Sequence, residues 1–347
     1  METVWFVLVA LMLVSYVVLD GFDLGAGAMH LMGARTEEER RTLLQAIGPV
    51  WDGNEVWLLA AGGTLFYAFP LLYASSFSGF YLALNMVLWL LVLRALGIEF
   101  RLHLENRLWR AFFDGVFCFA SILLIIFFGA ALGNVLRGVP LGPDHYFFVP
   151  LWTDFTPGAQ PGILDWYTVL CAVVTLVAVC MHGALYLIMK TEGALNARMR
   201  LIVTRLWPIL ALLSGVAVWA TVTVRPQVLE NYRSKPAGWM IPVLVAAGLG
   251  GMLYFTRAKQ ERKAFLASCL YVAATLCGGA YALYPALMPA SGDPANSITI
   301  HNAAAGPQSL SVGLIWWSFG MAIAIGYFVL VYTMFKGKVQ PINHGHG

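Results

Sequence analysis

Long apolar runs alternate with short polar segments along almost the whole chain. Nine of these runs come close to, or exceed, the roughly 20 residues with which a helix crosses the hydrocarbon core of a bilayer. They cover approximately residues 4–29, 50–72, 75–99, 112–136, 164–189, 202–224, 238–256, 264–288 and 310–335. No segment between them is long enough to be a separate domain. The pattern predicts an all-α integral membrane protein in which residues 1–347 form one polytopic membrane domain.

The composition supports the same class. Hydrophobic residues make up 60% of the chain and charged residues only 11%, whereas about a quarter of the residues of soluble domains are charged. The net charge of +3 does not indicate nucleic-acid binding, because the basic residues lie in short loops rather than on one stripe. The cysteines all lie inside apolar runs without a C-x-x-C pair, which favours small buried side chains over metal ligands: Cys118, Cys171, Cys180, Cys269 and Cys277.

The distribution of Lys and Arg predicts the orientation of the chain, because basic residues favour the cytoplasmic side of a membrane. With the N-terminus outside, most of the 21 Lys and Arg residues fall in inner segments and Arg94 falls within a span, while the outer segments hold Arg137, Arg225, Arg233 and Lys235. We therefore expect a periplasmic N-terminus and a cytoplasmic C-terminus. The first run has no basic segment before it, so we expect a true span rather than a signal peptide.

The first span carries two acids near its inner end. An ionisable group inside a bilayer costs several kcal/mol unless it is paired or faces a cavity, so such groups are functional candidates. Asp20 and Asp23 lie one helical turn apart on a similar face. Gly21 and Gly25 form a G-x-x-x-G surface, a candidate contact for a partner subunit. The alternative is that both acids sit in the inner headgroup region.

The second span opens with a dense group of polar and aromatic residues. Asp52 and Glu55 lie three residues apart after Pro49, near a helix N-terminus whose dipole favours negative charge. Trp51 and Trp57 flank them and are candidates for a subunit interface. The alternative is an interfacial aromatic belt with two capping acids.

The third span contains a basic residue at depth. Arg94 lies where Asp20 or Asp52 on a neighbouring helix could pair with it, although a long side chain can also snorkel to the interface. Glu99 follows at the inner end of the same span.

Two further ionisable residues lie in later spans. Asp114 follows Arg110 by four residues, which indicates a local pair on one helix. His182, inside the fifth span, suits a haem ligand, a proton relay or a satisfied core residue. Because the other histidines lie at span ends, in loops or in the tail, we expect no haem ligation and no metal site in this chain alone.

Two features lie outside the spans. Thr36 and Glu39 match a capping box, which predicts a short surface helix between the first two spans. His344 and His346 in the C-terminal tail are too few to define a metal site.

Seven short runs, in order along the chain, carry a family resemblance: LDGFDLG (19–25), WDGNEVW (51–57), GGTLF (62–66), FSGFY (77–81), EFR (99–101), GAALGN (129–134) and HGALYL (182–187). With them the chain resembles subunit II of the cytochrome bd-type quinol oxidases. His301 and Asn302 stand where some members have Trp-Asp, as in the branch often called cyanide-insensitive. Inhibitor tolerance does not carry over from that similarity.

The resemblance implies a partner, a reaction and a location. The partner is a larger subunit I that bears haem b and haem d, and the complex takes electrons from quinol to reduce O2 to water with cytoplasmic protons. The resemblance also implies a bacterial plasma (inner) membrane and a fold of two four-helix bundles plus one peripheral helix. Whether this chain holds a structural quinone or lipid, or binds small single-span accessory subunits, stays open.

The hypothesis from the sequence is a non-haem subunit that stabilises subunit I and contributes to proton delivery. The proposed path uses Asp20, Asp23, Asp52 and Glu55, with Arg94 as counter-charge and His182 as a weaker relay candidate. The alternatives are an independent secondary transporter, which also needs intramembrane acids, and a purely structural scaffold.

Overall fold

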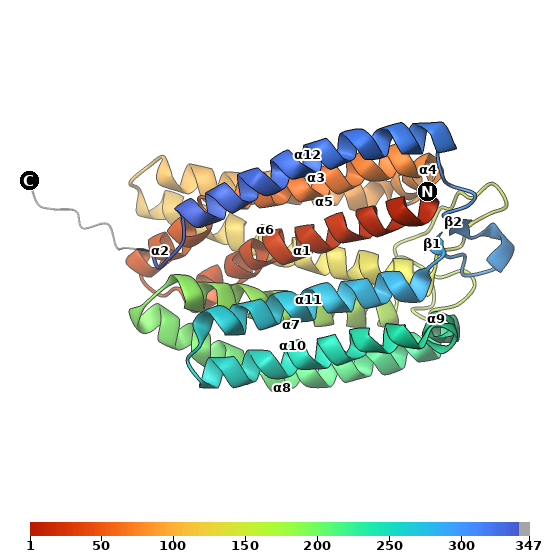
Figure 1. Ribbon diagram of the computed structural model, residues 1–347. Helices are drawn as coiled ribbons and strands as arrows, with labels where there is room; N and C mark the ends of the chain where they lie inside the picture. Colours follow the sequence, from red (N-terminus) through yellow and green to blue (C-terminus); the bar gives the residue numbers. More distant parts are fainter. Residues whose placement is uncertain (340–347) are drawn as a thin grey trace, which may run out of the picture.

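The computed structural model describes residues 1–339; the predicted tail histidines, His344 and His346, lie outside this range. Long helices run side by side along one axis (Figure 1). Their bounds are α1 (Glu2–Gly33), α3 (Trp51–Ala68), α5 (Tyr81–Glu99), α6 (Arg107–Arg137), α7 (Trp166–Lys190), α8 (Gly193–Val224), α10 (Met240–Arg257), α11 (Glu261–Leu283) and α12 (Pro307–Met334).

Short elements connect the long helices. The helices are α2 (Glu37–Ile47), α4 (Pro70–Gly79) and α9 (Glu230–Ser234), with 3-10 turns at 100–102, 226–229, 236–239 and 294–296. Strands β1 (Ala286–Met288) and β2 (Ile298–Thr299) form an antiparallel ribbon in which Ala286 faces Thr299. The ribbon lies at the end of the molecule opposite α2 (Figure 1).

The all-α membrane fold is confirmed, with one difference in detail. Within residues 1–339, eight helices are long and apolar enough to cross a membrane, and α3 is not among them. Polar residues in its first turns, including Asp52 and Asn54, lower the mean hydropathy of α3, although it runs beside α1 and α12 (Figure 1). The predicted run 50–72 is also divided, because Pro70 lacks an amide hydrogen and starts a new helix after Phe69.

The long helices group into two bundles and one peripheral helix. One bundle contains α1, α3, α5 and α6, the other contains α7, α8, α10 and α11, and they meet where α1 and α6 pack on α7. The largest buried apolar cluster lies around this junction. Helix α12 lies outside both bundles, and only its Leu310 is buried.

The two bundles touch backbone to backbone. A Cβ atom added to Gly25 would overlap the carbonyl oxygen of Val179, and one added to Gly183 would overlap the backbone of Gly25. Gly21 faces His182 on the same side, with 3.6 Å between its built Cβ and the ring Cδ2. The G-x-x-x-G surface is therefore covered by α7 of this chain and is not available to a second subunit, which corrects the interface expectation for both glycines.

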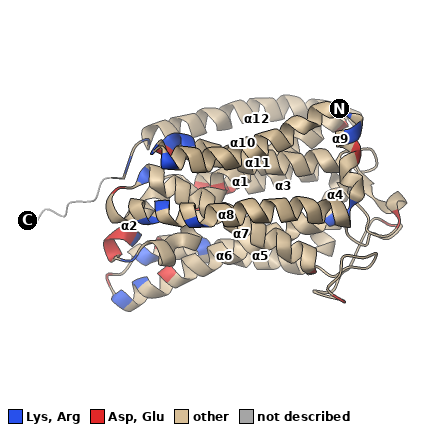
Figure 2. Ribbon diagram, turned by 90° about the horizontal axis from the view of Figure 1, so that it is seen from below, with Lys and Arg blue, Asp and Glu red and all other residues tan. Residues whose placement is uncertain are grey.

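Helix α2 confirms the predicted surface helix. The Thr36 hydroxyl accepts from the Glu39 amide and the Glu39 carboxylate accepts from the Thr36 amide, both at 3.2 Å, so the capping box is complete. Glu39 also accepts two hydrogen bonds from Arg198 of α8, at 2.9 and 3.1 Å, and these hold the pKa of Glu39 below its ordinary value. Figure 2 shows that Lys and Arg gather at this end of the molecule.

Candidate functional site

A buried ion cluster links three helices of the first bundle. The Arg94 guanidinium of α5 donates to both carboxylate oxygens of Asp20 in α1, each at 2.8 Å. Its other terminal nitrogen donates to Glu55 of α3 at 2.9 Å. Asp20 and Arg94 are 0% exposed, whereas the Glu55 side chain is 23% exposed. The cluster therefore reaches from the sealed interior toward the surface at Glu55.

The surroundings of Arg94 explain how a charge is kept at this depth. Burying an ion costs several kcal/mol, and the attraction of a close counter-ion offsets this only with good geometry. Arg94 has two carboxylate partners, and its guanidinium carbon also lies 5.8 Å from the centre of the Trp51 ring. Trp51 is thus a buried neighbour of the cluster rather than an exposed interface residue. Of the two partners considered for Arg94, the structure gives Asp20.

A second hydrogen-bonded group adjoins the first. The Asn54 amide donates to the buried carboxylate of Asp23 at 2.7 Å, and the Tyr332 hydroxyl donates to the Asn54 oxygen at 2.8 Å. This chain of contacts joins α1, α3 and the peripheral α12. The sequence offered a signal for Asn54, because it lies in the polar run at the start of α3. It offered none for Tyr332, which lies in an apolar run.

Several buried polar atoms around these groups have no protein partner among residues 1–339. They are Asp23 Oδ1, Arg94 Nε and Trp57 Nε1. Buried polar atoms of this kind bind ordered water when the site is polar and roomy enough. The arrangement therefore places unsatisfied polar atoms beside buried carboxylates, which are groups that can hold protons.

Two predicted acids lie nearer the surface, and one predicted tryptophan packs within the chain. Asp52 is exposed and accepts a hydrogen bond from the Gly53 amide at 2.7 Å. Glu99 is exposed and forms none of the ion pairs found in the described part of the chain. Trp57 packs against Phe328 of α12 with 5.4 Å between ring centres, so its ring contacts another helix of the same chain.

Asp114 belongs to a separate cluster at the charged end of the molecule. Its buried carboxylate contacts three basic side chains on other elements: His30 at 2.5 Å, Arg101 at 2.5 Å and Arg40 at 3.1 Å. The expected local pair with Arg110 is wrong, since Arg110 contacts Glu37 of α2 at 3.3 Å. On α6 the carboxylate faces the end of α1, whereas Arg110 turns toward α2. Asp114 thus ties four segments together and lies apart from the Asp20 cluster.

Comparison with known proteins assigns the chain to a family. Residues 1–335 match the family model for cytochrome bd terminal oxidase subunit II. The chain belongs to that family.

Curated relatives and a solved structure agree with this assignment. The chain is 34% identical to a probable cytochrome oxidase subunit 2 of Haemophilus influenzae, over 97% of this chain and 94% of the relative. It is 31% identical to the cytochrome bd-I ubiquinol oxidase subunit 2 of Escherichia coli strain K12, over 95% and 91%. The bd oxidase of Geobacillus thermodenitrificans has the same fold, with a TM-score of 0.72 at 16% identity over 96% of this chain and 98% of that one.

Membership in the subunit II family defines the setting of the chain. It is one subunit of a haem-containing quinol oxidase, an oxidoreductase complex that includes a subunit I, and it is a multi-span protein of a bacterial respiratory membrane. This excludes the independent secondary transporter considered from the sequence.

His182, the histidine predicted inside a span, does not offer a haem ligand. Both ring nitrogens of His182 are engaged, Nδ1 at 2.8 Å from the Ser268 hydroxyl and Nε2 at 2.9 Å from the Val18 carbonyl oxygen. The ring also stacks on Phe265, with 5.2 Å between centres. Neither nitrogen of the His182 ring is left for iron. The described residues contain no group of three or more His, Cys, Asp or Glu suited to a metal ion. His182 is therefore a satisfied core residue by its contacts.

Proposed function

We propose that this chain stabilises subunit I and delivers cytoplasmic protons for the reduction of O2 to water. The observation that supports the proposal is the buried ion cluster, in which Asp20, Glu55 and Arg94 are held within hydrogen-bond distance inside the first bundle. Proton delivery needs groups that accept and release protons where bulk water is excluded, and carboxylates beside a fixed cation meet that need.

Exposure gives the path a direction. Asp52 is exposed, Glu55 is 23% exposed and Asp20 is fully buried, so these carboxylates form a series from the surface inward. Asp23 is a further buried carboxylate, held by the Asn54 amide. With all four carboxylates ionised, Arg94 alone would not balance them, and a proton is the smallest charge that can move in to do so. Asp52 is the proposed entry and Asp20 the proposed inner station.

The remaining parts of the reaction lie outside this chain in our proposal. Haem b and haem d belong to subunit I, where quinol is oxidised, and the engagement of His182 in hydrogen bonds supports that division. The cluster of Lys and Arg at the α2 end (Figure 2) supports a cytoplasmic location for that end and a periplasmic N-terminus. Protons then enter from the side on which the basic residues gather.

The test uses the assembled oxidase carrying Glu55→Gln, which keeps the side chain's size but removes its capacity to hold a proton. We expect quinol oxidase turnover to fall on the order of tenfold or more, at the low end of the effect of a positioned proton-transfer group. Asp52→Asn should lower turnover less, because bulk water reaches an exposed entry by other routes. Haem content, measured from the absorption spectrum, should stay intact in both.

Asp154→Asn is the matched control, because Asp154 is an exposed carboxylate of the loop between α6 and α7. Wild-type turnover in both Glu55→Gln and Asp52→Asn, with haem content unchanged, would contradict proton delivery. Reduced complex yield with normal proton uptake per turnover would instead assign the acids to a scaffold.

A further inference from the structure

A buried face of α1 continues from Asp23 toward the charged end of the molecule. Asp23, Gly27 and His30 follow one another at spacings of four and three residues, so they lie on one face of the helix. All three are buried within this chain alone. The series of carboxylates proposed above makes no use of this part of α1 beyond Asp23.

Asp23 takes up a proton at one particular oxygen. Its Oδ2 accepts a hydrogen bond from the Asn54 amide at 2.7 Å. Its Oδ1 is buried and has no hydrogen-bond partner among residues 1–339. Because Asn54 already donates to Oδ2, a proton that binds the carboxylate binds Oδ1. The partner of Oδ1 must therefore donate to the ionised group and accept from the protonated one, and a hydroxyl or a water molecule does both.

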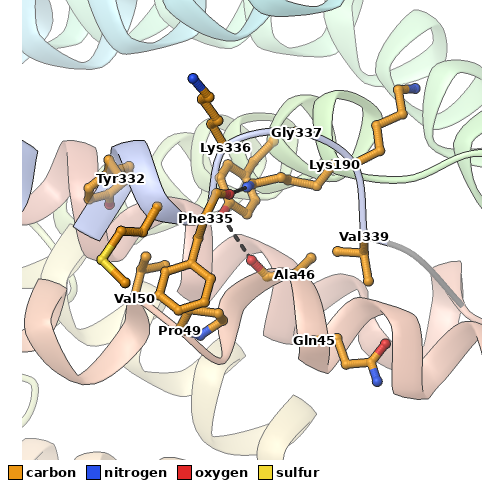
Figure 3. Close-up of a pocket in the computed structure, with 13 residues that line it drawn as sticks. Gln45, Ala46, Pro49, Val50, Lys190, Tyr332, Phe335, Lys336, Gly337 and Val339 are labelled. Carbon is orange, nitrogen blue, oxygen red and sulfur yellow. Dashed lines mark hydrogen bonds between the residues drawn. The ribbon is translucent and has the colours of Figure 1, made fainter. Parts of the chain in front are cut away.

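The cavity near Asn54 does not supply that partner. It has a volume of about 270 Å³, lies between the ends of α2 and α7 and the chain that follows α12, and is lined by Tyr332 (Figure 3). The Tyr332 hydroxyl contacts Asn54, which in turn contacts Asp23. An amide nitrogen keeps its hydrogens and has no lone pair to accept another, so a proton does not pass from the cavity to Asp23 through this contact. The exchange at Oδ1 needs another group.

A hydroxyl without a partner faces α1 one turn from Asp23. A Cβ atom added to Gly27 would overlap the hydroxyl of Ser121 in α6. Ser121 is buried, and its hydroxyl forms no hydrogen bond within the described part of the chain. Cβ positions four residues apart on a helix are about 5–6 Å apart, so the Ser121 hydroxyl lies about that far from the Cβ atom of Asp23. One water molecule spans such a gap, since it forms hydrogen bonds of about 2.8 Å on either side.

His30 lies one turn beyond Gly27 and offers an acceptor. Its Nε2 lies 2.5 Å from Asp114 Oδ1, and Arg101 donates to the same carboxylate, which is therefore ionised and only accepts. The ring hydrogen is thus on Nε2, and in the neutral ring Nδ1 has a free lone pair. Nδ1 is buried and has no partner among residues 1–339. A nitrogen of this kind accepts a hydrogen bond from a hydroxyl or a water molecule.

We propose that buried water, held by the Ser121 hydroxyl and His30 Nδ1, exchanges protons with Oδ1 of Asp23. Buried polar atoms without protein partners are the groups that bind ordered water. The water donates to the ionised carboxylate. An excess proton on the water then moves to Oδ1: one O–H bond of the hydronium ion breaks, one forms on Asp23, and the water left behind accepts from the new acid. Release reverses the step.

Ser121 and His30 are positioning residues in this proposal, and Asp23 is the group that holds the proton. The proposal rests on the proposed function in counting Asp23 among the carboxylates that deliver protons. It deepens that function by naming the groups through which Asp23 exchanges its proton.

The decisive variant is Ser121→Ala in the whole oxidase. It removes one hydroxyl that has no protein partner, so a purely structural role predicts no loss. We expect quinol oxidase turnover to fall about fivefold, the equivalent of one hydrogen bond, with haem content unchanged. In the Asp23→Asn background Ser121→Ala should have no further effect, because it acts through Asp23. Thr256→Val is the matched control, since it removes another buried, unpartnered hydroxyl, in α10 of the other bundle.

Hydroxyl-radical labelling tests the water itself. Radicals generated by X-rays from bound water label the side chains beside it. Phe117 is buried and packs on His30 with 5.3 Å between ring centres, so its ring should be labelled in the purified oxidase. Phe69 is equally buried in an apolar cluster and should stay unlabelled.

Three results would overturn the proposal. They are wild-type turnover in Ser121→Ala, a further loss when Ser121→Ala is added to Asp23→Asn, and an unlabelled Phe117. Labelling does not depend on turnover, so its result stands whether or not Glu55→Gln supports proton delivery. Wild-type turnover in Asp23→Asn with a labelled Phe117 would show that the water is present but that Asp23 delivers no proton.

Discussion

The pairing of Arg94 with Asp20 predicts a definite order of stabilities. Arg94→Gln removes the two hydrogen bonds of 2.8 Å to Asp20 and the one of 2.9 Å to Glu55. Removing one partner of a buried ion pair costs about 3–5 kcal/mol, because the orphaned carboxylate stays desolvated without a counter-charge. The double variant with Asp20→Asn removes that orphaned charge, so we expect it to recover most of the loss.

The assay is the half-life of the purified oxidase at a fixed elevated temperature, followed by loss of the haem spectrum, since large membrane complexes unfold irreversibly. A loss of about 3–5 kcal/mol corresponds to two to almost four orders of magnitude when expressed fully in the unfolding rate. Arg233→Gln is the control, because Arg233 is exposed and belongs to no ion pair of the described residues. A single variant as long-lived as wild type, or a double variant shorter-lived than the single, would refute the reasoning.

Three further predictions concern other contacts. Gly25→Ala should lower the yield of assembled oxidase, measured by haem per membrane protein, whereas Gly63→Ala should not, since an added Cβ there meets nothing within 4 Å. Tyr332→Phe removes one partly buried hydrogen bond, worth about 1 kcal/mol, and should shorten the thermal half-life without changing haem content. The pKa of Glu39 is lowered in the folded state. Its contribution to the stability of α2 is therefore present above its unfolded pKa, near 4.5, and is lost as the pH falls through its folded pKa. Hydrogen exchange of α2 should rise in that acidic window, and Glu39→Gln should remove the dependence; an unchanged profile in the variant would contradict it.

The helices were predictable because a bilayer leaves few choices. A run of about 20 apolar residues without partners for its backbone must be helical, so the eight spans found among the described residues follow from hydrophobicity alone. The break between α3 and α4 was harder to place, because Pro70 can begin a helix or kink one. The hydrophobic run on either side of Pro70 is compatible with both outcomes.

Which side chains meet was less predictable than their depth. Spacing along a helix gives the depth of Arg94 and Asp20 but not the rotation of one helix against another, so Asp20 and Asp52 were equal candidates. The same limit misassigned Asp114 to Arg110 on its own helix, whereas its three partners lie on other elements. Rotation depends on packing, as at Gly25, where the close approach of α7 fixes which face of α1 turns inward.

The contact of α12 with α3 has a consequence for biosynthesis. Tyr332 lies near the end of the last long helix, so the ribosome releases it after nearly the whole chain is made. Until then the side-chain oxygen of Asn54 lacks the hydroxyl that contacts it in the finished fold, and an unsatisfied buried polar group costs about 1–3 kcal/mol. A chain terminated before α12 therefore leaves the Asn54 oxygen without this partner, and the hydrogen bond forms only once α12 has been made and packs against α3.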